Sequence, residues 1–153
     1  MQNTGVSSSN VELVRLSVEA FRRGDFDEAF AVYDPAVEWR TADDEPDSQT
    51  HMGIPALRRF VAGLAETWAD RFDSSVTFED FIDRGDWVVA PWSGRLHGHG
   101  SGIEVDVSET YAVLVRDGLI RRVDEYRTVE QALEAVCPSA GNETTPPGER
   151  GRF

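Results

Sequence analysis

The stretch that decides the fold is Asp117-Gly118-Leu119-Ile120-Arg121-Arg122-Val123-Asp124-Glu125-Tyr126. Asp-Gly is a strong signal for a tight β-hairpin turn. Just upstream, residues 103–115 alternate apolar and polar side chains over a long run. Just downstream, Thr128 can cap a short final helix. The pattern predicts two long antiparallel strands that are joined at Asp117-Gly118 and form one wall of the domain.

Three helices are expected before this wall. Ser9-Asn10-Val11-Glu12 has the form of a capping box and begins a helix that Gly24 ends. Asp25 caps a second, short helix, which Asp34-Pro35 stops. Ile54-Pro55 begins a third helix, because proline fits the first helical turn.

The other predicted strands cover residues 37–41, 76–83 and 87–97. Pro91 lies inside the last of these, which suggests a bulge or a sheet edge. An acidic loop is expected at residues 42–50 and a flexible connection at residues 98–102. This order of elements predicts an α+β domain in which helices cover one face of a strongly curved antiparallel sheet.

Composition excludes several classes of partner. The chain has 153 residues, which suits one domain, and a net charge of −13 that opposes binding to nucleic acid or anionic membranes. The sequence contains no apolar run long enough to span a membrane and no secretory signal, so a cytoplasmic protein is expected. Its basic residues are all arginine, which favours a GC-rich bacterial source.

The ends of the chain are polar. Residues 1–8 and 138–153 are expected to be disordered, which leaves one domain over residues 9–137. Cys137 is the only cysteine, so an internal disulfide and a cysteine metal site are both excluded.

The order of elements resembles the nuclear transport factor 2-like (NTF2-like) fold, and its SnoaL-like branch in particular. That branch groups polyketide cyclases with relatives of limonene epoxide hydrolase and ketosteroid isomerase. The residues that carry the likeness are Phe21-Arg22-Arg23-Gly24-Asp25, Asp34-Pro35-Ala36-Val37-Glu38-Trp39, Gly53, and Asp117-Gly118-Leu119-Ile120 through Glu125-Tyr126. The resemblance covers about residues 9–136 and implies a conical pocket between the sheet and the helices.

The resemblance also implies a homodimer formed through the outer face of the sheet. Thr110, Ala112 and Leu114 would supply a partly apolar strip on that face.

Glu109 is the first candidate for chemistry. It interrupts an apolar row made by alternate residues of the strand 103–115. A carboxylate there would be partly desolvated and its pKa would rise, which suits general acid or base chemistry. The alternative is a glutamate at the strand rim that meets water or pairs with an arginine.

Glu125 is the second candidate, and here periodicity alone is ambiguous. The resemblance to limonene epoxide hydrolase implies a pocket side chain at Val123 and a catalytic acid at Glu125. Two carboxylates at Glu109 and Glu125 would form an acidic pair, of which one member holds a proton near neutral pH. The alternative is that Glu125 forms a salt bridge with Arg121, Arg127 or another arginine.

The rest of the machinery of these relatives is missing. The arginine and aspartate of the hydrolase fall on Trp92 and Gly94, and its water-orienting polar groups fall on Trp39 and Thr41. The base of ketosteroid isomerase likewise falls near Trp39, and its oxyanion tyrosine falls near Ser17.

The candidate substrate-binding residues are Trp39, Thr41, His51, Trp92, Tyr111 and Val123. Aromatic walls suit flat hydrophobic ligands, although core packing is an equal alternative for each aromatic residue. His51 precedes Gly53 at the expected pocket mouth. His97 and His99 could chelate a metal, but no third ligand accompanies them, so no metal or cofactor is expected.

The sequence therefore predicts a SnoaL-like domain that binds a hydrophobic small molecule. If it is an enzyme, it performs cofactor-free acid/base chemistry as a cyclase, isomerase or hydrolase. The alternative is a non-catalytic ligand-binding or dimerisation module. The two differ in whether Glu109 and Glu125 face one cavity.

Overall fold

A curved sheet and four helices make up the described part of the computed structural model, which comprises residues 4–42, 49–68 and 76–136. In chain order the elements are α1 (Thr4–Arg22), α2 (Phe26–Phe30), β1 (Tyr33–Arg40), β2 (Thr50–Met52), α3 (Ile54–Thr67), β3 (Val76–Phe78), β4 (Ile82–Arg84), β5 (Trp87–His97), β6 (Glu104–Arg116), β7 (Leu119–Tyr126) and α4 (Val129–Val136). Among these described residues, no helix is long and apolar enough to cross a membrane.

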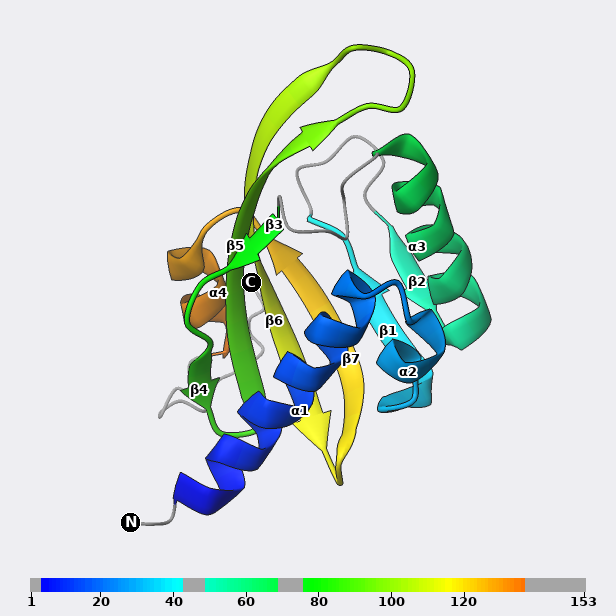
Figure 1. The fold of residues 1–153 in the computed structure, drawn as a ribbon. Coiled ribbons are helices and arrows are strands. Elements are labelled where there is room, and N and C mark those ends of the chain that lie inside the picture. Colours follow the sequence, from blue (N-terminus) through cyan, green and yellow to red (C-terminus); the bar gives the residue numbers. More distant parts are fainter. Residues whose placement is uncertain (1–3, 43–48, 69–75, 137–153) are drawn as a thin grey trace.

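The strand order in the sheet is β2-β1-β7-β6-β5-β3, with β4 also paired to β5. Every strand pair is antiparallel except β1 and β7, which run parallel. The predicted α+β fold with a curved sheet is confirmed (Figure 1). The parallel pair departs from the fully antiparallel expectation, because most of the domain separates β1 from β7 and such a long connection permits either direction.

The Asp117-Gly118 hairpin forms as predicted. Asp117 has φ 55° and Gly118 has φ 74°, the pair of positive values that a two-residue turn between twisted strands needs. The two strands pair from Thr110 opposite Tyr126 down to the turn, with a register shift at Leu114 and Val115. β6 is long enough to run with β5 beyond the body of the sheet, as an arm that ends at the pair His97 and Glu104 (Figure 1).

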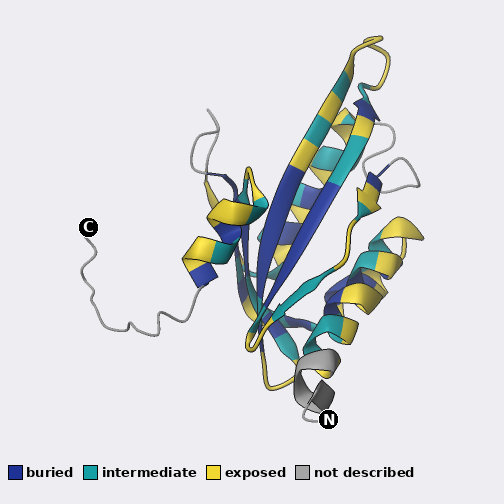
Figure 2. Ribbon diagram, turned by 90° about the vertical axis from the view of Figure 1, so that its left-hand side faces the viewer, coloured by how far each residue is buried: buried dark blue, intermediate teal, exposed yellow. Residues whose placement is uncertain are grey.

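The helices cover both faces of the sheet, which corrects the expectation that they share one. Figure 2 shows α4 on the side of the sheet opposite to α1. Ala132 and Val136 of α4 pack with Val89 and Ala112 in a small apolar cluster. The Thr128 hydroxyl accepts the Gln131 N–H at 3.1 Å and so caps α4 as expected. The outer face of the sheet is therefore partly occupied by the chain itself.

This covering changes the expected dimer surface. Thr110 and Ala112 are buried and Leu114 is half-buried, so the strip named for a homodimer is not a free apolar surface. The covering helix follows directly from β7 and returns across the sheet. The homodimer remains a prediction, but this strip no longer supports it.

Several boundaries differ from those predicted. α1 begins at Thr4, five residues before the predicted start, because Ser9 and Asn10 are tolerated inside a helix whose preceding turn is already formed. β1 begins at Tyr33, and a register shift against β7 accommodates Asp34-Pro35 within the strand. Residues 1–3, 43–48 and 137–153, with Cys137 and most of the acidic loop, lie outside the described residues.

Pro91 leaves its own strand, β5, regular and interrupts the strand that pairs with it on one side. β5 pairs with β6 without a register shift, so the predicted bulge is absent from that ladder. On the other side of β5, the predicted strand at residues 76–83 is split into β3 and β4 around Pro91. The Glu79 N–H donates to the Pro91 carbonyl at 2.9 Å in the gap between them. The gap lies where proline cannot donate a ladder bond.

Two glycine-to-alanine substitutions should move stability in opposite directions. Gly118→Ala places a Cβ at φ 74° and should lower the free energy of unfolding by about 1 kcal/mol or more. Gly63→Ala, inside α3 with nothing within 4 Å of the added Cβ, should raise it by about 0.5–1 kcal/mol. Urea unfolding of the two variants measures both. An unchanged or increased stability of Gly118→Ala would contradict the described turn.

Candidate functional site

An apolar cavity of about 60 Å³ lies between the inner face of the sheet, α1 and α3. Its wall on the sheet side comes from strands β1, β3, β5, β6 and β7, and includes Trp39, Tyr111, Val113 and Val123. The helices contribute Val14, Phe21, Phe60 and Leu64, among others. Nearly all of the wall is aliphatic or aromatic, so the cavity favours an apolar occupant.

Sheet register places the two candidate carboxylates on the inner face of the sheet. Tyr111 lies opposite Glu125 across β6 and β7, while Glu109 lies opposite Trp92 across β5 and β6. Glu109 is two residues from Tyr111, so it is the diagonal neighbour of Glu125, and such neighbours are roughly 7–8 Å apart. Both glutamates are 8% exposed. The alternation read from the sequence placed Glu109 with the apolar row, whereas for Glu125 the periodicity was ambiguous and only the family resemblance implied its face.

Glu125 is oriented by an aromatic donor. The Trp39 Nε1–H donates to Oε2 of Glu125 at 2.7 Å in a buried hydrogen bond. β1 and β7 run side by side there, with Trp39 opposite Val123. A hydrogen bond from a neutral donor stabilises the ionised carboxylate and fixes its direction. This indole donor is a partner that the sequence did not predict for Glu125.

Glu109 has a cationic neighbour. Nη1 of Arg127 lies 3.6 Å from Oε2 of Glu109, whose side chain is only 10% exposed. The alternative of an arginine pair therefore describes Glu109. The positive charge of Arg127 offsets that of Glu109 and so weakens the repulsion between the two carboxylates.

A second hollow adjoins the same carboxylate. It measures about 490 Å³ and lies beside α4, where β1 ends and β7 continues. Its wall is much more polar than that of the apolar cavity and contains Arg40, Asp124, Glu125, Arg127 and Glu134, among others. Glu125 thus borders this polar hollow, while its hydrogen-bond partner Trp39 lines the apolar cavity. Neither Glu109 nor Glu125 is among the described residues that line the apolar cavity, and Glu125 is connected to its wall through Trp39.

The remaining predicted substrate-binding residues have different environments. Val123 and Tyr111 line the cavity, and Trp92 is buried against Tyr111 and Phe78. The Thr41 hydroxyl forms hydrogen bonds with the backbone instead. It donates to the Gln49 carbonyl at 3.2 Å and accepts the Gln49 N–H at 2.9 Å. It closes the base of the acidic loop.

His51 lies next to Trp39 in the register of β1 and β2 and stacks on Phe60, with ring centres 4.2 Å apart. Its Nε2 is buried and has no hydrogen-bond partner among the described residues. Burial lowers the pKa of His51, because the charged imidazolium loses solvation. At neutral pH the ring is therefore uncharged and acts as part of an aromatic wall.

Sequence reasoning missed a polar pair at the far end of the cavity. Ser17 and Tyr33 both line it, and they are hydrogen-bonded to each other. The Ser17 hydroxyl also donates to the Ala29 carbonyl at 3.1 Å. Burial raises the pKa of Tyr33, which keeps its hydroxyl neutral. The weak signal was Ser17 itself, a small polar residue on the apolar stripe of α1.

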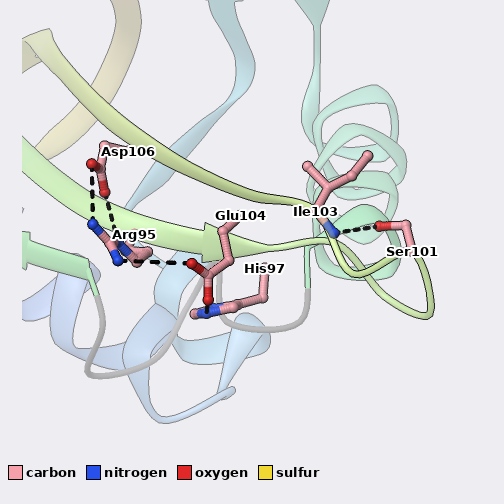
Figure 3. A network of polar contacts seen from close by, with 6 residues as sticks. All are labelled: Arg95, His97, Ser101, Ile103, Glu104 and Asp106. Carbon is pink, nitrogen blue, oxygen red and sulfur yellow. Dashed lines mark hydrogen bonds and ion pairs between the residues drawn. The ribbon is translucent and has the colours of Figure 1, made fainter.

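His97, one of the two histidines considered as metal ligands, belongs to a surface network on the arm. Nε2 of His97 lies 2.8 Å from Oε2 of Glu104, and Arg95 bridges Glu104 and Asp106 (Figure 3). Among the described residues, no group of three or more histidine, cysteine or acidic side chains could hold a metal ion. The network braces the outer face of the arm.

Comparison with known proteins identifies the family. The SnoaL-like domain model matches residues 14–123. The chain belongs to this family. No curated protein matches the chain.

Solved structures of SnoaL-like and NTF2-like proteins share this fold. A candidate SnoaL-like polyketide cyclase from Jannaschia sp. CCS1 is 20% identical, covers 93% of this chain and 99% of its own, and has a TM-score of 0.70. TerC co-crystallised with polyporic acid is 20% identical over 84% of this chain and 98% of its own, with a TM-score of 0.66. An NTF2-like protein of unknown function from Burkholderia pseudomallei is 19% identical over 84% and 98%, with a TM-score of 0.67. At these identities the neighbours show the fold of this SnoaL-like domain.

A double-mutant cycle should detect the bond between Trp39 and Glu125. Trp39→Phe leaves a buried carboxylate without this donor and should destabilise the domain by about 1–3 kcal/mol beyond its packing loss. The double variant Trp39→Phe/Glu125→Leu should lose less free energy of unfolding than the sum of the losses in the two single variants. Trp87→Phe, under α4 on the other face, serves as the control and should be additive with Glu125→Leu. Additivity of Trp39→Phe with Glu125→Leu would contradict the bond.

His51 should make stability depend on pH. The pKa of His51 is lower in the folded protein than its ordinary value of about 6.5, so the unfolded chain binds the proton more readily. The contribution of His51 to stability is therefore fully present above a pH of about 6.5, the ordinary pKa, and decreases as the pH falls below it. His51→Phe keeps the stack on Phe60 and should reduce the loss between pH 7.5 and 5.5 in urea unfolding. An unchanged pH dependence in this variant would exclude a buried neutral imidazole.

Proposed function

We propose that this SnoaL-like domain binds a hydrophobic small molecule between the sheet and the helices α1 and α3, and that Glu125 acts on it as a general base. The observation that carries the proposal is the buried Glu125 carboxylate, held at 2.7 Å by an indole that also lines the apolar cavity. A base must be within reach of the proton it removes and fixed in direction. Trp39 supplies the fixed direction.

The electrostatics favour a base over an acid. The Trp39 N–H stabilises the ionised form of Glu125, and Arg127 offsets the charge of Glu109 nearby. The neighbouring polar hollow gives a route by which Glu125 can return its proton to water. In this proposal Glu109 and Arg127 are positioning residues, and no cofactor is needed.

The reaction class that fits is proton abstraction from a carbon next to a carbonyl group. The C–H bonding pair moves into the enolate, and the Glu125 oxygen takes the proton. The enolate carbon then either takes a proton back from Glu125 or closes a ring by attacking a second carbonyl carbon of the same substrate. In the ring closure the π pair of that carbonyl moves to its oxygen, which takes the proton back from Glu125. A cyclase and an isomerase share this first step. A hydrolase would use the same base on water that enters through the hollow. The polyketide cyclase assignment of a structural neighbour supports the first two.

The ligand must widen the cavity to enter. About 60 Å³ is less than the roughly 300–1,000 Å³ of sites for drug-sized ligands. α1 packs chiefly on α2 and β4, whereas α3 packs on β1 and β2. The two helices therefore pack on different elements, and they can move apart to widen the cavity. TerC, a structural neighbour that was co-crystallised with polyporic acid, supports the binding of a small molecule by this fold.

A non-catalytic ligand-binding or dimerisation module is the second candidate. The hydrogen bond from Trp39 favours it in one respect, because a buried acceptor of this kind can serve stability alone. A homodimer remains part of either proposal, with an interface that leaves the residues under α4 covered.

Deuterium exchange into 2-tetralone, an apolar bicyclic ketone, tests the proposal. In D2O the wild-type protein should accelerate exchange of the protons next to the carbonyl, followed by ¹H NMR. Glu125→Gln keeps an acceptor for Trp39 and should lower the accelerated rate by roughly 10²-fold or more. Glu66→Gln, at an exposed position of α3, is the control and should match the wild type. Equal rates for Glu125→Gln and the wild type would leave only the binding module.

A further inference from the structure

Arg22 is the single charged side chain among the described residues that line the apolar cavity. It belongs to the last turn of α1 and is exposed to solvent. A residue that is exposed and also lines the cavity marks the place where the cavity meets solvent. The entrance beside α1 therefore carries one positive charge.

Among the described residues, Arg22 has no partner for its charge. The nearby arginines are paired: Arg23 lies 3.0 Å from Glu28, Arg58 lies 2.8 Å from Asp27, and Arg15 lies 3.6 Å from Glu12. Arg22 forms no side-chain hydrogen bond or ion pair in the described parts of the chain. In a chain of net charge −13, acidic partners are plentiful, so its lack of one is a local feature of this entrance.

We propose that the ligand of this cavity is an amphipathic anion, with an apolar body inside and one carboxylate or similar group held by Arg22 at the entrance. The inference rests on the proposed ligand-binding function and names the class of ligand. A guanidinium matches a carboxylate with two parallel N–H donors. The remaining wall is apolar apart from Ser17, Tyr33 and the aromatic polar tips, so the charged group stays at the rim.

Because the net charge of the protein is negative, tighter binding of an anion than of its neutral counterpart would indicate a specific site. A protein of charge −13 repels anions in general, which lowers their non-specific binding. An anion that binds more tightly than its neutral counterpart must therefore meet a specific cation. The competing explanation is that Arg22 only complements the carbonyl end of α1. That role affects stability and leaves ligand preference unchanged.

Two matched pairs of probes separate these explanations: benzoate with benzyl alcohol, and 2-naphthoate with 2-naphthylmethanol. Binding is measured by titration calorimetry and by the ¹⁵N-resolved indole N–H resonance of Trp39, which lines the cavity. We expect the better carboxylate to bind the wild type at least tenfold more tightly than its alcohol at low salt. Arg22→Gln should remove that preference and leave the affinity for the alcohol unchanged.

Arg23→Gln is the matched control, because Arg23 is adjacent and exposed but paired with Glu28 away from the cavity wall. It should keep the preference for the carboxylate. Equal binding of acid and alcohol by the wild type, or an unchanged preference in Arg22→Gln, would overturn the inference while the ligand-binding function stands. If no probe of either pair shifts the Trp39 resonance, the proposed function itself is overturned.

Discussion

A single buried hydrogen bond, from Trp39 Nε1 to Glu125 Oε2 at 2.7 Å, ties the site to the fold. It joins β1 to β7, the one parallel pair of the sheet, across 86 residues of sequence. A buried carboxylate without a donor would be costly, so the bond permits an acid at this position. The same indole forms part of the cavity wall, and so packing of the core and orientation of the Glu125 carboxylate depend on one side chain.

The site gains its chemical character from two spaces of opposite polarity. On one side the inner face of the sheet and the helices α1 and α3 enclose an apolar cavity. On the other, the end of β1 leaves a polar hollow beside α4, and Glu125 contributes to its wall. The proposed function requires an apolar substrate to reach Glu125 past Trp39, and it assigns to the hollow the exchange of the proton with water. The outer helix α4 matters here, because it forms part of the hollow and buries the outer apolar residues of β5 and β6.

Local signals in the sequence predicted much of this arrangement. Alternation predicted the face of Glu109, the family resemblance implied that of Glu125, and Asp117-Gly118 predicted the hairpin that aligns them. The partners of the two acids could not be predicted, because Trp39 lies on a distant strand and Arg127 lies just past β7 in a turn. The position of α4 was missed because an amphipathic helix of eight residues does not reveal which face of a sheet it covers.

Exchange of the Trp39 indole N–H with solvent, measured by ¹⁵N-resolved NMR, tests the central claim most directly. The account predicts that this proton exchanges at least tenfold more slowly than the indole proton of the half-buried Trp68. Its chemical shift should also move in Glu125→Gln, since the acceptor loses its charge. Exchange as fast as that of Trp68, with a shift indifferent to Glu125→Gln, would contradict the bond and the base that depends on it.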